Sequence, residues 1–239
     1  ETYNYFLKPK LSLKLNPGHT KNLQNNEYKL NVDNLFNLDR ISSKTTLEGG
    51  FSIAYGTDYV LTKKNNDELL NIKLANNIRL KENDDLEKSN QLGSKTSNFF
   101  GEIKYNPTSF LTTTHNFSTL NNLTDINYQN LIADIKFSNF INTSDYLRED
   151  GDNNSYFLNK TTFNFNSSNN LSFSTRENLK TNLTEYYNLI YEYKNDCLKA
   201  SIEYQKDYYN DRDIKPEENI FLKLTIIPFG STSSPNLRK

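Results

Sequence analysis

The chain has 239 residues, a formal net charge of −1, a charged fraction of 24% and a mean hydropathy of −0.80. It has no apolar run long enough for a transmembrane helix, yet its aromatic fraction of 13%, all Tyr and Phe, is too high for a disordered chain. One cysteine allows no internal disulfide, and two histidines in unrelated contexts argue against a His/Cys metal site. Because the chain lacks Met and opens on Glu1, we expect a mature product or a fragment.

Alternation of apolar and polar residues predicts about twelve strands. Tyr5–Leu15 shows the pattern, with leucines on one face and lysines on the other. Many of the segments approach the ~9–11 residues that a tilted membrane strand needs. The segments are, in chain order, Tyr5–Leu15, Leu47–Tyr55, Leu70–Leu80, Phe99–Tyr105, Phe110–Thr119, Leu131–Phe137, Phe140–Arg148, Phe157–Phe165, Leu171–Lys180, Tyr186–Lys194, Leu198–Gln205 and Ile220–Phe229.

The connections between these segments alternate in length. Short turns are predicted at Asn106-Pro107, Ser138-Asn139, Ser167–Asn170 and Asn195-Asp196. Longer polar connections are predicted at Asn16–Ser42, Lys81–Lys95, Glu149–Asn154 and Tyr209–Glu217, and Gly56–Asn66 is long for its side. Outer-membrane barrels place short turns in the periplasm and long loops outside. The sequence therefore predicts an all-β, antiparallel transmembrane β-barrel over residues 1–230, with a short tail over 231–239.

A soluble β-sandwich or solenoid is the alternative fold, because half-buried strands alternate in the same way. Strand number, strand length and loop alternation together favour the barrel. No Gly-rich phosphate loop, Ser/His/Asp set or carboxylate pair stands out, so we expect no enzyme and no cofactor. We also expect no nucleic-acid partner.

Two segments carry a resemblance to a known protein family in their residues as well as in their pattern. The first is Asp33-Asn34-Leu35-Phe36-Asn37-Leu38-Asp39-Arg40 with Leu47-Glu48-Gly49-Gly50 and Tyr55-Gly56. The second runs from Asn195-Asp196-Cys197 through Tyr204–Tyr208 and Arg212–Pro216 to Phe229-Gly230. Both resemble the carboxy-terminal half of the barrel in the lipopolysaccharide-assembly outer-membrane protein family, LptD, whereas residues 57–180 match only in strand rhythm.

The resemblance implies a C-terminal part of a larger barrel, in the outer membrane of a Gram-negative bacterium, that inserts lipopolysaccharide into the outer leaflet. It implies further partners: an LptE-like plug lipoprotein, a periplasmic LptA-like bridge reached through an N-terminal domain, and the barrel-assembly machinery. It also implies that Cys197 bonds to a cysteine of the amino-terminal region, with a free or incidental cysteine as the alternative. A general porin or nutrient-uptake channel is the alternative function, and a secreted or surface β-protein of structural role is a third.

The polar faces of the predicted strands carry about twice as many basic as acidic groups, which predicts a positive lumen that attracts a phosphate-bearing glycolipid. A Lys- and Asn-rich composition would fill any polar face in the same way, so both interpretations stay open. The basic residues singled out are Lys8, Lys10, Lys14, Lys73, Arg79, Lys104, Lys199 and Lys223.

The closing strand carries a separate hypothesis. In the family that this chain resembles, the last strand meets the first at a seam through which the lipid leaves sideways. Pro228 cannot donate a ladder hydrogen bond, so pairing near Phe229 should be weak. Proline near a strand end is also common without a gate, and the strand resembles a C-terminal barrel-assembly signal. The residues concerned are Ile220, Leu222, Leu224, Ile226, Pro228 and Phe229.

Overall fold

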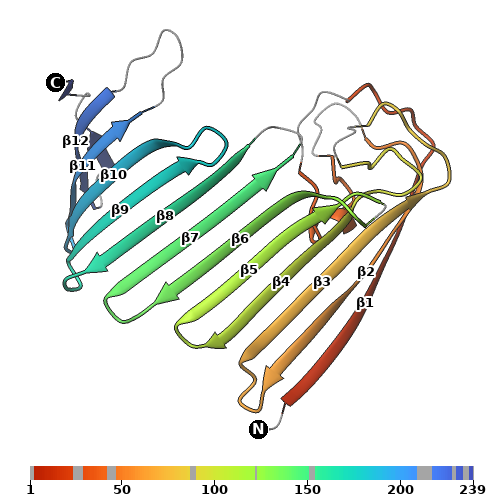
Figure 1. Cartoon of the computed structure of the whole chain (residues 1–239), viewed down its shortest axis with the longest axis horizontal. Helices are drawn as coiled ribbons and strands as arrows, with labels where there is room; N and C mark the ends of the chain where they lie inside the picture. Colours follow the sequence, from red (N-terminus) through yellow and green to blue (C-terminus); the bar gives the residue numbers. More distant parts are fainter. Residues whose placement is uncertain are drawn as a thin grey trace. The chain divides into compact units, whose positions relative to one another are not determined.

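The computed structural model describes residues 3–23, 29–41, 47–86, 90–121, 123–150, 154–208, 217–227, 230–233 and 237–238. They form a single antiparallel sheet in which each strand neighbours the next along the chain, from β1 to β13 (Figure 1). The twelve long strands are β1 Tyr3–Asn16, β2 Gly50–Lys63, β3 Glu68–Arg79, β4 Phe99–Thr108, β5 Leu111–Thr119, β6 Ile126–Lys136, β7 Phe140–Glu149, β8 Ser155–Asn164, β9 Asn169–Asn178, β10 Leu183–Lys194, β11 Leu198–Asp207 and β12 Glu217–Ile226. The predicted all-β, antiparallel fold with about twelve strands is confirmed.

The chain divides into two compact units. The first comprises Glu1–Pro107, Thr113–Leu131 and Glu149–Asp152, and the second comprises Thr108–Thr112, Ile132–Arg148 and Asn153–Lys239. No helix in the described ranges is long and apolar enough to cross a bilayer. The described helical element is one 3-10 turn, η1 Asn34–Phe36.

The sheet of the first unit has one apolar and one polar face, as the alternation predicts. In β1, Leu11 and Leu15 are 69% and 74% exposed, whereas Lys10, Ser12 and Lys14 on the other face are half-buried. The register of β1 with β2 aligns Lys14 with Ser52 and Ser12 with Ala54, so the polar face continues onto β2. Side chains of the loops cover this polar face.

The second unit keeps the same division of faces. Ile202 of β11 lies opposite Leu222 of β12, and both side chains are about half exposed on the apolar face. The adjacent position pairs Ser201 with Lys223 on the polar face. Alternation alone fixes this pattern, because a strand places successive side chains on opposite faces.

Several boundaries differ from the sequence predictions. β2 runs to Lys63, so Gly56–Lys63 is strand and the predicted long connection over Gly56–Asn66 is wrong. A tight turn closes the hairpin, since Asn66 donates to the Lys63 carbonyl at 2.9 Å and has a positive φ of 65°. With this turn, the connections after β2, β4, β6, β8 and β10 are all short, whereas on the opposite side the connection after β9, residues 179–182, is as short as these. The turn predicted at Asn106-Pro107 lies instead between Thr108 and Leu111, because β4 continues through Pro107.

The predicted tail contains two short strands, β13 Gly230–Ser233 and β14 Leu237–Arg238, and both pair with β12. β12 therefore has a partner on each side, β11 on one and the tail strands on the other. Among the described residues, β1 pairs only with β2.

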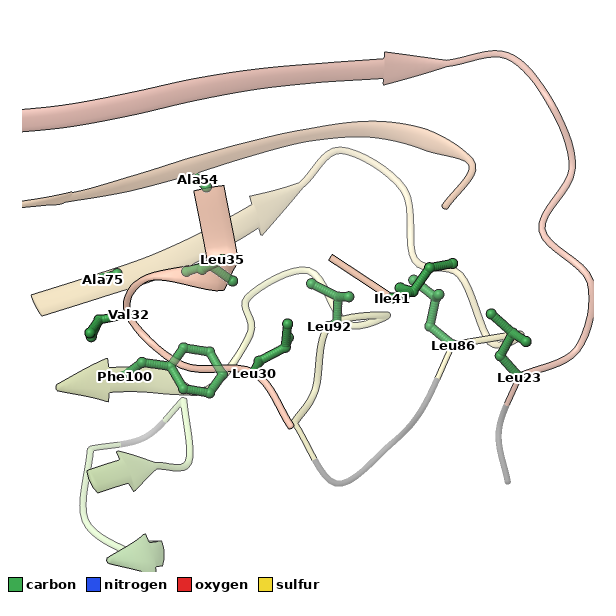
Figure 2. Close-up of a cluster of buried hydrophobic side chains, with 10 residues drawn as sticks. All are labelled: Leu23, Leu30, Val32, Leu35, Ile41, Ala54, Ala75, Leu86, Leu92 and Phe100. Atoms are coloured by element: carbon green, nitrogen blue, oxygen red, sulfur yellow. The ribbon is translucent and has the colours of Figure 1, made fainter. Parts of the chain in front are cut away.

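Buried apolar side chains of the first unit form one cluster, which lies where the loops meet the polar face (Figure 2). Long connections from β1 to β2 and from β3 to β4 gather at one end of these strands (Figure 1). The cluster comprises Leu23, Leu30, Val32, Leu35, Ile41, Ala54, Ala75, Leu86, Leu92 and Phe100.

Candidate functional site

Small residues on the polar face of β2 and β3 leave room for the loop that joins β1 to β2. Ser52 and Ala54 are buried on β2, and Ala75 is buried on β3. A side chain at Gly56 would meet the Leu74 carbonyl oxygen and the tip of the Phe36 ring. The loop can approach the strands closely only because these positions carry little or no side chain.

We call residues 29–41 of this loop the strap. Leu35, in the 3-10 turn, is 1% exposed and belongs to the same cluster as Ala54 and Ala75 (Figure 2). The Phe36 ring packs against this cluster, and the Lys10 ammonium of β1 lies 5.6 Å from the centre of the Phe36 ring. The strap therefore lies across the polar face over β1, β2 and β3.

A buried ion pair between Arg40 and Glu48 fixes the end of the strap. The Arg40 Nε and Nη2 atoms donate to the two carboxylate oxygens of Glu48, each at 2.6 Å, which is the bidentate geometry that suits a guanidinium. Arg40 also donates to Ser52 Oγ at 2.7 Å and Asn77 Oδ1 at 2.9 Å. These bonds tie the strap to both β2 and β3.

Glu48 collects two further cations. Arg79 of β3 donates to its Oε1 atom and to the Gly49 carbonyl, and Lys14 of β1 donates to Oε2 at 3.2 Å. Burial alone would raise the pKa of Glu48, but the hydrogen bonds and charges of Arg40, Lys14 and Arg79 outweigh it and lower the pKa to about 2. We call Arg40, Glu48 and Arg79 the anchor.

Exposed ion pairs hold the other end of the strap. The Lys73 ammonium lies 3.0 and 3.4 Å from the two carboxylate oxygens of Asp33, and 2.9 Å from Glu102 of β4. Asp33 is 60% exposed, unlike the anchor residues. Lys29 bonds to Glu149, at the end of β7, at 3.0 Å. We call the Asp33–Lys73 pair the latch.

Six of the eight basic residues singled out from the sequence have a carboxylate partner. Lys8 has no ion pair among the described contacts, but it aligns with Asp58 in the register of β1 with β2. Lys223 aligns with Ser201 of β11. Most of the positive charge expected on the polar face is therefore neutralised locally. The pairs are Lys10–Asp58 at 2.7 Å, Lys14–Glu48, Lys73–Asp33 and Lys73–Glu102, Arg79–Glu48, Lys104–Glu68 at 3.7 Å and Lys199–Glu192 at 2.7 Å.

Cys197 lies in the turn between β10 and β11 and is exposed, with no disulfide in the part of the chain that the structure describes. The Asn195 side chain accepts hydrogen bonds from the backbone N–H groups of Cys197 and Leu198, at 2.9 and 2.7 Å. This Asx turn holds the thiol-bearing residue at the tip of the hairpin.

Four of the proposed gate residues, Ile220, Leu222, Leu224 and Ile226, share one face of β12, as the period predicts. Pro228 and Phe229 lie outside the described residues. β13 pairs with β12 from Lys223 to Ile226. The edge of β12 is thus occupied by the chain's own tail.

The sequence reasoning missed three contributors to this site. Asp33 and Arg40 were placed in a polar connection, and Asp58 was not counted among the acidic groups of the polar face. Asp67, which was counted there, lies in the turn after β2. A usable signal was present, since buried Leu30, Val32, Leu35 and Ile41 are unexpected in a solvated loop.

No group of three or more His, Cys, Asp or Glu residues that could hold a metal ion occurs within the described ranges. A scan of protein-family models and a search of curated protein sequences give no match to this chain.

Proposed function

We propose that this chain is part of an outer-membrane β-barrel that delivers lipopolysaccharide to the cell surface. The observation that carries the membrane assignment is the two-faced antiparallel sheet. Leu7, Leu11, Leu13 and Leu15 of β1 are each at least 65% exposed on a single face. A contiguous apolar surface of this kind is unfavourable in water and suits the acyl chains of a bilayer.

The alternation of connection lengths supports the same proposal. The turns after β2, β4, β6, β8 and β10 are short, and the connections 17–49, 80–98 and 208–216 on the opposite side are long, with 179–182 as a short exception there. In an outer-membrane barrel, the short turns face the periplasm. On this proposal, Cys197 lies in the periplasm, an oxidising compartment in which a disulfide with a second cysteine would persist.

Lipopolysaccharide delivery rests on the resemblance to the LptD family, and the position of the resembling residues supports it. The segment Asp33–Arg40 lies within the strap on the polar face, and with Leu47–Gly50 it supplies Arg40 and Glu48 of the anchor. A lumen that passes an anionic glycolipid needs cations along its wall, and Lys10 and Lys73 occupy such positions beneath the strap.

A porin or nutrient channel is the second candidate, and the local neutralisation of the basic residues favours it. Pairs such as Lys10–Asp58 leave a polar wall of nearly balanced charge, which is suited to small solutes. The two functions predict different defects when the protein is removed: loss of lipopolysaccharide delivery for the translocon, and loss of solute uptake for the channel.

Depletion of the intact protein in its native host tests the choice. We expect newly made lipopolysaccharide to stop reaching the cell surface, as measured by pulse labelling and modification with a surface enzyme. Complementation with a Lys10→Glu, Lys73→Glu variant should restore delivery more slowly than the parent, whereas Lys64→Glu, in the turn after β2, should restore it fully. Normal delivery after depletion, together with steady ion conductance of the purified protein in planar bilayers, would replace the translocon proposal with the channel.

A further inference from the structure

We propose that the strap is an autoinhibitory segment, which occupies the Lys73 ammonium on the polar face with its own carboxylate and is released when a phosphate-bearing ligand takes over Lys73. The inference deepens the proposed function and rests on it for the identity of the natural ligand. It concerns the strap, residues 29–41, and the latch, Asp33–Lys73.

The two ends of the strap are held by contacts of different strength. At one end, Arg40 and Glu48 have side chains that are 2% and 1% exposed, and they form a bidentate pair supported by Arg79. Removing one member of such a pair leaves an uncompensated buried charge. At the other end, Asp33 is 60% exposed, and solvent screens its bond to Lys73. The end of the strap that carries the latch, together with the Lys29–Glu149 pair, is therefore its weaker electrostatic attachment, and opening there leaves the anchor intact.

The latch has the chemistry of an anion site that is already filled. Two carboxylate oxygens of Asp33 face the Lys73 ammonium at 3.0 and 3.4 Å. A phosphate presents the same kind of oxygen acceptors with more charge. Glu102, on the neighbouring strand, keeps Lys73 in position at 2.9 Å after Asp33 leaves. The exchange therefore replaces one anion by another at a fixed cation.

Release of the latch exposes further groups beneath the strap. The Phe36 ring lies near Lys10, whose side chain is 35% exposed, and against Gly56. Ala75, two residues from Lys73 on the same face, is 2% exposed because the strap and its cluster cover it. An anionic amphiphile would meet Lys10 and Lys73 with its phosphates and the surface around Ala75 with its apolar part.

Ala75 offers a reporter for strap opening. In a Cys197→Ser background, an Ala75→Cys variant of the intact protein carries one thiol beneath the strap, and a water-soluble maleimide measures its exposure. Asp33→Asn removes the latch charge, and we expect it to raise the labelling rate about two- to five-fold, the range for an exposed ion pair. Asp67→Asn, in the turn after β2, is the matched control and should leave the rate unchanged. Unaltered labelling in Asp33→Asn would overturn the latch.

The ligand arm uses inorganic pyrophosphate and lipopolysaccharide micelles, each against sodium chloride of equal ionic strength. We expect both to raise labelling of the protein with Asp33 intact and to add little in Asp33→Asn, where the latch is already lost. An increase with lipopolysaccharide alone supports the strap and assigns recognition to the whole headgroup. An increase with pyrophosphate alone supports the strap but contradicts lipopolysaccharide as the cargo. No increase with either, or equal increases with and without Asp33, would overturn the inference.

Discussion

Glu48→Gln gives the sharpest test of the anchor. The carboxylate accepts both donors of Arg40 at 2.6 Å as well as bonds from Arg79 and Lys14. Glutamine keeps the size of the side chain but has one acceptor oxygen, and its amide group turns donors toward the guanidinium groups. The substitution therefore leaves two buried cations without a carboxylate.

The buried ion pair and the lowered pKa of Glu48 both indicate a loss of a few kcal/mol. Removal of one partner from a buried ion pair costs about 3–5 kcal/mol. The pKa of Glu48 falls from 4.5 to about 2 in the folded protein, which at 1.36 kcal/mol per pKa unit is about 3 kcal/mol of stability. We therefore expect Glu48→Gln to destabilise the strap and the adjoining sheet by about 3 kcal/mol.

The measurement is urea-dependent labelling of the thiol introduced at position 75 in the Ala75→Cys, Cys197→Ser protein, with and without Glu48→Gln. We expect the midpoint to fall strongly in Glu48→Gln and to stay unchanged in the exposed control Asp67→Asn. Equal midpoints in Glu48→Gln and the parent would show that the buried pair contributes no net stability, and would refute the reasoning.

The remaining predictions concern pH, two close-packed glycines and the lone cysteine. Folding lowers the pKa of Glu48, so the stability that its carboxylate contributes is present above pH 4.5 and is lost as the pH falls toward 2. Pepsin is active in this pH range and should cleave the strap of the parent increasingly below pH 4.5. The Glu48→Gln variant should show a smaller dependence of cleavage on pH. Gly56→Ala should cost about 1–3 kcal/mol in urea unfolding, since the added carbon meets the Leu74 carbonyl oxygen and Phe36, whereas Gly18→Ala meets only the flexible Asn16 side chain. Gly101→Ala should expel the Phe117 ring from its position against β4, with a loss of similar size and a changed Phe117 environment by NMR. The full-length protein isolated from its native host should change gel mobility on reduction, and Cys197→Ser should abolish the change. No change in the parent would exclude an intermolecular or interdomain disulfide.

The strand pattern was predictable because it is local. The side-chain period of two assigns faces from a few neighbouring residues, as in β1 and β10 to β12. Strand boundaries were less predictable where polar residues continue a strand, as at Thr57 and Asp58 of β2. These residues belong to the strand because they pair with β3, although the alternation of apolar and polar side chains does not indicate it. The turn predicted at Pro107 was misplaced for a related reason. Pro107 lies near the end of β4, where the lack of a backbone N–H donor is tolerated.

The ion pairs were not predictable from charge counts. Residues such as Lys73 and Asp33 are forty positions apart and meet only because the strap lies on the polar face. Counting signs on each strand overestimated the positive charge, because it left out carboxylates that come from the loop, as with Asp33, or from a neighbouring strand, as with Asp58.

The sequence by itself determined that the chain forms an antiparallel sheet of about twelve strands in chain order, with one apolar and one polar face, because alternation and short turns act over a few residues. Only the tertiary structure decided what lies on the polar face. Strap, anchor and latch depend on small residues of β2 and β3 that admit the loop, and on Arg40, Glu48 and Arg79 reaching one buried point from three segments. The contact between these three residues depends on the register of the strands and the path of the loop, and the alternation of apolar and polar residues predicts neither.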